Sequence, residues 1–170
     1  MSVQLIPRRH YTGQRQLYVL HRWDGIASAL DPIEFHQVIK SLVARIPAPY
    51  DYVVSLDGPA LPASTLISQI SGKPLQVAVK ADLELPLQIM VAEPGSPNPI
   101  FFYNLTPGRV ILVDDEIRTG RTVIGCIEAL AAHNVIVVAV IVPIGSTKFG
   151  IATQFQAKNI PLIVHQWYDI

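Results

Sequence analysis

Residues 110–122 read Val-Ile-Leu-Val-Asp-Asp-Glu-Ile-Arg-Thr-Gly-Arg-Thr, and this stretch decides the fold. Its first four residues are apolar and predict a strand that is buried on both faces, as in a parallel sheet. Two adjacent carboxylates, Asp114 and Asp115, follow at the carboxyl end of that strand, and a short turn then opens a helix. Open parallel sheets bind ligands at this edge. The stretch therefore predicts both a fold class and the place to look for chemistry.

The two halves of this stretch suit two different chemical groups. The carboxylates can accept hydrogen bonds from vicinal hydroxyls, such as those of a ribose ring. The turn offers backbone N–H groups, the hydroxyls of Thr119 and Thr122, and the flexible Gly120 at a helix N-terminus, which together suit a phosphate dianion. Arg118 and Arg121 add positive charge that can pair with phosphate oxygens. A phosphorylated ribose carries both a diol and a phosphate.

The flanking sequence predicts strands that alternate with helices. Hydrophobic runs predict strands at residues 52–56, 75–80, 110–113, 135–142 and 162–164. Capping residues and apolar periodicity predict helices at residues 31–45, 60–71, 119–132 and 148–158. Such alternation implies right-handed β-α-β crossovers and a parallel sheet. Residues 81–99 contain four prolines and one glycine, which is typical of a lid, a binding loop or a disordered segment.

Length and composition narrow the class of protein further. The 170 residues are half hydrophobic and predict one domain, residues 1–170, with a substantial core. No apolar run reaches the length of a membrane span, and basic residues are too few and too scattered for a nucleic-acid surface. The N-terminal residues lack the apolar core of a secretory signal, and Cys126 is the only cysteine, so we expect a cytoplasmic protein. The histidines and Cys126 show no metal-ligand spacing, so no metal site of the protein's own is predicted.

Residues 110–122, with four apolar residues, two acids, three variable residues and Thr-Gly-x-Thr, resemble the signature that binds 5-phosphoribosyl-1-pyrophosphate (PRPP) in type I phosphoribosyltransferases. The resemblance implies a three-layer α/β fold with a parallel sheet, a small hood and a mobile lid loop. It also implies that Asp114 and Asp115 hold the ribose hydroxyls and are the catalytic pair. By the same resemblance the 5′-phosphate is bound by Arg118, Thr119, Gly120, Arg121 and Thr122.

The same resemblance extends to other segments and to the partners. It places the pyrophosphate of PRPP at Asp57, Gly58, Pro59, Ala60 and Lys80. The lid then corresponds to residues 81–99, and the hood that holds the base to parts of residues 1–25 and 143–170. It implies Mg²⁺ bound mainly through PRPP, and a homodimer. The implied activity is transfer of the phosphoribosyl group to a nitrogenous base, weakly favouring a purine, as in nucleotide salvage.

The sequence departs from the family pattern at several positions. Glu116 stands where the family has an apolar residue, so it must point to solvent to be tolerated. Arg121 replaces the usual second glycine, and Arg118 argues against a preference for 6-oxopurines. The loop at residues 57–60 has no basic residue. Compensation for the charge of pyrophosphate is then expected from Mg²⁺, from oriented N–H groups, or from Lys80 with Arg8, Arg9 or Arg15.

Three interpretations of function therefore stand side by side. One is the transferase. The second is a non-catalytic protein that binds PRPP or a nucleotide as a regulator or sensor. The third is another activity that uses PRPP or a ribose phosphate on the same fold. Aromatic side chains near the C-terminal end, Phe149, Trp167 and Tyr168, either stack on the base or pack the core, and Lys148 either contacts a base carbonyl or lies in solvent.

Overall fold

The computed structural model describes residues 3–9, 15–92 and 98–169 of the chain. Within them, the centre of the molecule is a six-stranded sheet in which β10, β9, β7, β3 and β4 are neighbours in that order, while β8 pairs with β9. Every pairing in this sheet is parallel. Its strands are β3 (Tyr52–Leu56), β4 (Leu75–Ala78), β7 (Gly108–Val113), β8 (Glu116–Ile117), β9 (Val135–Ser146) and β10 (Leu162–Tyr168).

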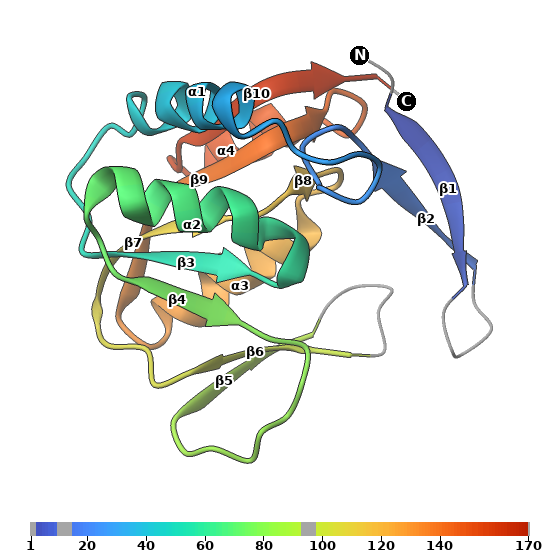
Figure 1. The fold of residues 1–170 in the computed structure, drawn as a ribbon. Helices are drawn as coiled ribbons and strands as arrows, with labels where there is room; N and C mark the ends of the chain where they lie inside the picture. Colours follow the sequence, from blue (N-terminus) through green and yellow to red (C-terminus); the bar gives the residue numbers. More distant parts are fainter. Residues whose placement is uncertain (1–2, 10–14, 93–97, 170) are drawn as a thin grey trace.

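Helices cover both faces of the sheet, which gives the three layers predicted from the alternation of elements (Figure 1). On one face lie α1 (Pro32–Val43) and α2 (Leu61–Ser71), the latter preceded by a 3₁₀ turn, η1 (Gly58–Ala60). The other face is covered by α3 (Arg121–Ala131) and α4 (Ile151–Ala157). The predicted α/β fold with a parallel sheet is confirmed.

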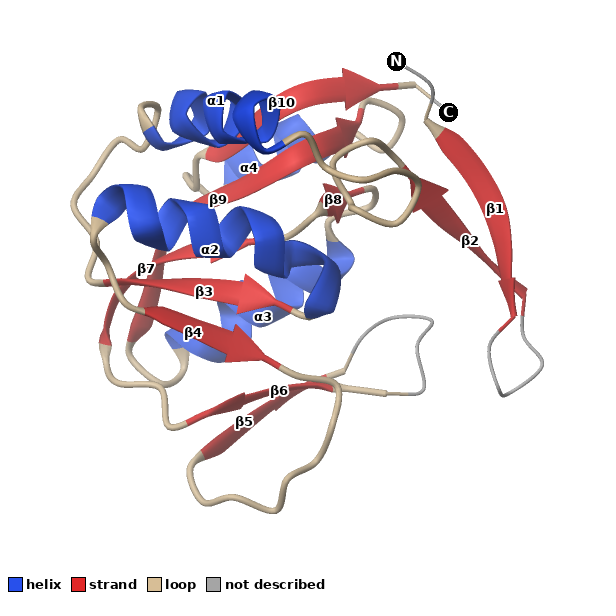
Figure 2. Cartoon of the chain, viewed as in Figure 1, coloured by secondary structure: helices blue, strands red, loops and turns tan. Residues whose placement is uncertain are grey.

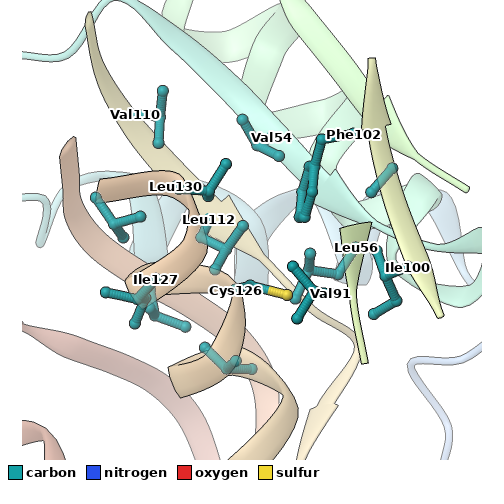
Figure 3. Close-up of a cluster of buried hydrophobic side chains, with 14 of the residues drawn as sticks. Val54, Leu56, Val91, Ile100, Phe102, Val110, Leu112, Cys126, Ile127 and Leu130 are labelled. Atoms are coloured by element: carbon teal, nitrogen blue, oxygen red, sulfur yellow. The ribbon is translucent and has the colours of Figure 1, made fainter. Parts of the chain in front are cut away.

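The core consists of two clusters, one on each face of the sheet. Side chains alternate between the two faces along a strand, so Val54 of β3 and Leu112 of β7 belong to the α3 side, and Val53 and Ile111 to the α1–α2 side. Figure 3 shows the α3-side cluster, in which Cys126 lies fully buried among aliphatic side chains. Both faces are apolar, which explains the near-continuous hydrophobic runs in the sequence.

Most predicted elements are confirmed, with shifts at their ends. Residues 52–56 are β3 as predicted, and Asp31 caps α1 by accepting hydrogen bonds from the N–H groups of Ile33 and Glu34. Gly72 ends α2 in the left-handed conformation, as expected of a C-terminal glycine. β9 and β10 each run four residues further than predicted, to Ser146 and Tyr168.

The segment predicted to be irregular, residues 81–99, contains a strand. β5 (Gln88–Val91) pairs antiparallel with β6 (Ile100–Tyr103) and forms a separate two-stranded ribbon. Ile89 and Val91 are buried in the α3-side cluster, whereas Gln88 and Met90 are exposed. The expectation of an irregular segment is therefore wrong for residues 88–91, because packing against α3 stabilises a strand there. Residues 93–97 lie outside the described residues, and the predicted lid as a mobile element stays a prediction.

A second ribbon lies beside the carboxyl ends of the central strands (Figure 2). β1 (Gln4–Arg9) and β2 (Arg15–Leu20) form this antiparallel hairpin, which belongs to the segment predicted to build the hood. The sequence analysis contains no strand there. Among the described helices, none combines the length and hydrophobicity that crossing a membrane requires.

Candidate functional site

The carboxyl edge of the central sheet gathers most of the predicted site residues. β3 and β7 are adjacent parallel strands in which Ser55 pairs with Val113. The segments that follow them, beginning at Asp57 and Asp114, therefore leave the sheet at the same edge. β8 and its Glu116 continue along this edge beside Ile144 of β9.

Asp114 and Asp115 form the acidic pair at the end of β7. The backbone N–H of Asp115 donates to Asp114 Oδ1 at 3.0 Å, and that of Asp114 donates to the carbonyl of Ile141 at 3.2 Å. Burial, and then the negative charge of Asp115, raise the pKa of Asp114 well above its usual range. The Asp115 side chain is 17% exposed, so part of its carboxylate reaches solvent. A ligand that donates hydroxyl hydrogens would stabilise both carboxylates.

The turn between the acids and α3 exposes a helix N-terminus. Gly120 precedes α3 with φ of 72°, and a Cβ there would lie 3.4 Å from Phe155 Cε2. The left-handed backbone conformation therefore favours glycine here, and a Cβ would be in close contact with Phe155. Among the described residues, no side chain caps α3 by a hydrogen bond, in contrast to α1 and its Asp31. The first N–H groups of α3 remain available to an anion.

The remaining predicted phosphate ligands surround this turn. Thr119 and Thr122 are half-buried, and Arg121 is exposed on the first turn of α3. Arg118 is half-buried, and its positive charge offsets part of the rise that burial causes in the pKa of Glu116 and of Tyr168. The predicted 5′-phosphate residues thus lie together in the turn before α3 and in its first residues.

Glu116 does not point to solvent, which is the condition under which the sequence analysis expects a third acid to be tolerated at this site. Its carboxylate accepts a hydrogen bond from the hydroxyl of Tyr168 on β10. Burial raises the pKa of Glu116, and burial together with the nearby carboxylate raises that of Tyr168. Tyr168 is buried at 7% exposure, so it packs the core rather than presenting its ring to a base. A tyrosine partner, rather than solvent, is what accommodates this third acid.

The predicted pyrophosphate loop begins with an unusual backbone conformation at Asp57, where φ is 58° and ψ is −179°. Gly58, Pro59 and Ala60 form the 3₁₀ turn that leads into α2, and Ser64 Oγ lies 2.9 Å from Ser55 Oγ, which ties α2 to β3. Lys80 follows β4, and its Nζ lies 3.0 Å from Asp57 Oδ2. Among the five residues predicted to bind pyrophosphate, the one basic residue, Lys80, therefore forms an ion pair with the one acidic residue, Asp57.

The other sequence candidates follow or end the strands β9 and β10 at the same carboxyl edge. Phe149 and Lys148 are exposed after β9, and Trp167 is 39% exposed on β10, where its ring packs over Gly145. The side chains of Arg8, Arg9 and Arg15 lie outside the described residues. Within the described chain, no group of three or more histidine, cysteine or acidic side chains is arranged to hold a metal ion.

One residue at the carboxyl edge, His21, was not predicted from the sequence to belong to the site. His21, after β2, is fully buried, and its Nε2 lies 3.8 Å from Asp115 Oδ2. The sequence analysis considered this histidine only for metal spacing. Its contact with an acid far along the chain has no local signal in the sequence.

Comparison with known proteins supports the assignment of the fold. The chain is 26% identical over 131 residues to a hypoxanthine/guanine phosphoribosyltransferase of Methanohalophilus mahii, an alignment that covers 75% of this chain and 69% of the relative. It is 37% identical over 106 residues to the bifunctional protein PyrR of Bacillus mycoides, covering 56% and 57% of the two chains. The chain is related to the type I phosphoribosyltransferases.

The solved structures agree with this relationship. The adenine phosphoribosyltransferase of Rhodothermus marinus superposes with a TM-score of 0.72 at 17% identity, over 98% of this chain and 94% of that one. At such identity the likeness shows the fold alone, which is the type I phosphoribosyltransferase fold. No protein-family model matches the sequence.

Proposed function

We propose that this chain is a phosphoribosyltransferase that transfers the phosphoribosyl group of PRPP to a nitrogenous base and releases pyrophosphate. The observation that carries the proposal is the acidic pair Asp114–Asp115 placed directly before the uncapped N-terminus of α3 at the carboxyl edge of the sheet. One group suits a ribose diol and the other a phosphate, in the order in which they occur in ribose 5-phosphate. The activities of its relatives are of this class.

In the proposed reaction a ring nitrogen of the base forms a bond to the anomeric carbon of the ribose. The bond from that carbon to pyrophosphate breaks, the leaving group takes the electron pair, and the base releases a proton. Positive charge develops on the sugar in the transition state. The negative charges of Asp114 and Asp115 then stabilise the ring while their oxygens fix its hydroxyls. Residues 118–122 hold the 5′-phosphate and so keep the anomeric carbon in place.

Charge compensation for the leaving pyrophosphate is the weakest part of the site. Lys80 supplies one positive charge, which is already opposed by Asp57. Mg²⁺ carried by PRPP would supply the remaining positive charge, since Mg²⁺ is commonly held through substrate phosphate oxygens. The N–H groups at the start of α2 add oriented dipoles, since Ala60 provides no side-chain cap.

The base is proposed to be a purine. Two of the named proteins, the hypoxanthine/guanine enzyme and the adenine enzyme, carry the names of purines, whereas the name of PyrR specifies no base. Arg118 stands where the 6-oxopurine enzymes have an acid and the adenine enzymes have a small residue. This position therefore argues against a 6-oxopurine and does not by itself select adenine. A homodimer and a cytoplasmic location stay predictions from the sequence and its resemblance.

The test is pyrophosphate release with PRPP, Mg²⁺ and a panel of purine and pyrimidine bases. We expect release with one base or a few, and loss of release in Asp114→Asn/Asp115→Asn. The matched control is Asp51→Asn, at the opposite edge of the sheet, where the Asp51 carboxylate accepts the N–H of Arg109 at 2.8 Å. If the wild-type protein binds PRPP and the double variant does not, but no base leads to release of pyrophosphate, the protein is a PRPP sensor and not a transferase.

A further inference from the structure

His21 occupies a position that a packing role alone does not explain. Its side chain is fully buried, and its Nε2 has no hydrogen-bond partner among the described residues. Leaving a buried polar atom without a partner carries a free-energy cost. The nearest acidic oxygen is Oδ2 of Asp115, at 3.8 Å, which is just beyond hydrogen-bond distance. The unpartnered atom thus faces one of the two carboxylates of the site.

The other ring nitrogen settles which atom carries the hydrogen. The backbone N–H of Trp23 donates to His21 Nδ1 at 3.1 Å. A nitrogen that accepts this bond has no hydrogen of its own, so in the neutral ring the hydrogen is on Nε2. A donor therefore points at the carboxylate of Asp115.

The turn that carries His21 is firmly held. The Asp24 carboxylate accepts hydrogen bonds from three backbone N–H groups: those of His21 at 2.9 Å, Ile26 at 2.6 Å and Ala27 at 2.9 Å. Trp23 stacks on Phe35 of α1 with ring centroids 5.9 Å apart. The imidazole is consequently fixed with respect to the sheet, and a small movement of Asp115 is enough to complete the hydrogen bond.

We propose that His21 is a positioning residue for Asp115: its Nε2–H holds one carboxylate oxygen, so that the other faces the ribose hydroxyls. Because Nε2 is inaccessible and the Asp115 side chain is 17% exposed, His21 acts through Asp115 and does not touch the ligand. This role rests on the proposed function, since it presumes that Asp115 binds the ribose. The contact between His21 and Asp115 thus links the segment after β2 to the proposed ribose subsite after β7.

Two substitutions separate positioning from simple packing. His21→Asn keeps an acceptor for the N–H of Trp23 but removes the donor that faces Asp115, whereas His21→Gln places an amide donor near Nε2 and gives up the acceptor. Binding of ribose 5-phosphate and of inorganic phosphate is measured by calorimetry, and folding by thermal unfolding. Inorganic phosphate has no diol, so it reports on the 118–122 loop alone.

If the proposal is correct, His21→Asn is the more stable of the two variants but binds ribose 5-phosphate more weakly than His21→Gln does. His21→Asn should weaken ribose 5-phosphate about tenfold, leave phosphate within about twofold, and unfold close to the wild-type temperature. His21→Gln should bind ribose 5-phosphate within about threefold of the wild type although it is the less stable variant. If only His21→Gln folds, the proposal is tested by the affinity of that variant for ribose 5-phosphate, compared with the affinity of the wild type.

Three results would overturn this role. Unchanged ribose 5-phosphate binding in His21→Asn would show that the donor is not used, and an equal loss for phosphate would show a merely structural effect. In both cases a wild-type protein that binds ribose 5-phosphate more tightly than phosphate leaves the proposed function intact. A wild-type protein without that preference would overturn the ribose site itself, and the role of His21 with it.

Discussion

The two anion-binding halves of the candidate site lie at the same edge of one sheet, yet they are prepared differently. At residues 114–122, two acids precede a helix whose N-terminus has no side-chain cap among the described residues, and the acids repel each other. At residues 57–60 the acid and the cation of the subsite already form a pair, Asp57 with Lys80 at 3.0 Å. The first half is unsatisfied until a ligand arrives, whereas the second half is neutralised internally.

This difference suggests how binding energy is divided between them. Ribose hydroxyls and a phosphate would relieve the excess negative charge and the uncapped helix end in the first half, so this half should bind its ligand without rearrangement. In the second half, pyrophosphate must compete with Asp57 for Lys80. Tight anchoring of the group that stays and weaker retention of the group that leaves suit a transfer reaction.

The largest effect is expected from removing the cation of the second half. Lys80→Met should lower kcat/KM about 100-fold, because charge on the departing pyrophosphate would lose a direct partner. The steady-state rate of pyrophosphate release measures it. The matched control is Lys158→Met, which breaks a similar ion pair of 2.8 Å with Glu128 on the surface. Equal activity of the two variants would show that Lys80 serves Asp57 alone.

The next effect concerns the turn of the first half. Gly120→Ala should lower the free energy of unfolding by about 1–2 kcal/mol, because alanine is strained at φ of 72°. It should also weaken binding of inorganic phosphate. Gly72→Ala is the control, since it has φ of 66° but nothing within 4 Å of a Cβ. Thermal unfolding and calorimetry should show both variants destabilised and only Gly120→Ala impaired in binding.

Residues adjacent in the sequence could be interpreted correctly without the structure. The hydrophobic run of β7, the acids after it and the turn into α3 are local, so their pattern predicts the strand, the helix start and the carboxyl edge. The cap at Asp31 and the left-handed Gly72 are equally local signals. β5 was missed because its short alternating run, Gln88–Val91, lies among prolines and owes its stability to contacts with α3.

Contacts between distant segments could not be predicted in this way. The hydrogen bond from Tyr168 to Glu116 joins β10 to β8, and the buried His21 reaches Asp115 from the N-terminal segment. Each depends on how the sheet orders its strands, which periodicity does not reveal. Lys80 was named from its position after a strand, but its pairing with Asp57 depends on the adjacency of β3 and β4.

A smaller effect should appear in the stability of the first half. Burial raises the pKa of Asp114, so the folded state binds a proton more tightly than the unfolded chain does. Stability is therefore expected to fall as pH rises from the unfolded value toward the folded one. Asp114→Asn should abolish this part of the pH dependence and raise the free energy of unfolding near neutral pH by about 1 kcal/mol.

Denaturant unfolding at several pH values measures this effect, in the absence of ligand. Asp51→Asn, at the other edge of the sheet, is the control that removes one charge without touching the pair. A less stable Asp114→Asn variant at neutral pH would mean that the carboxylate is better solvated than its burial implies.

The smallest effect tests the internal neutralisation of the second half. Asp57→Asn should raise the affinity for inorganic pyrophosphate two- to fivefold in buffer without Mg²⁺, because a partly exposed ion pair of this kind contributes only about 0.2–1 kcal/mol. Displacement of a fluorescent or radiolabelled ligand by pyrophosphate measures this affinity with the required precision. Glu128→Gln is the matched control, since it releases Lys158 away from the site. If pyrophosphate bound more weakly to Asp57→Asn, the Asp57–Lys80 pair would be a device that orients the lysine toward the anion, and the contrast between the two halves would disappear.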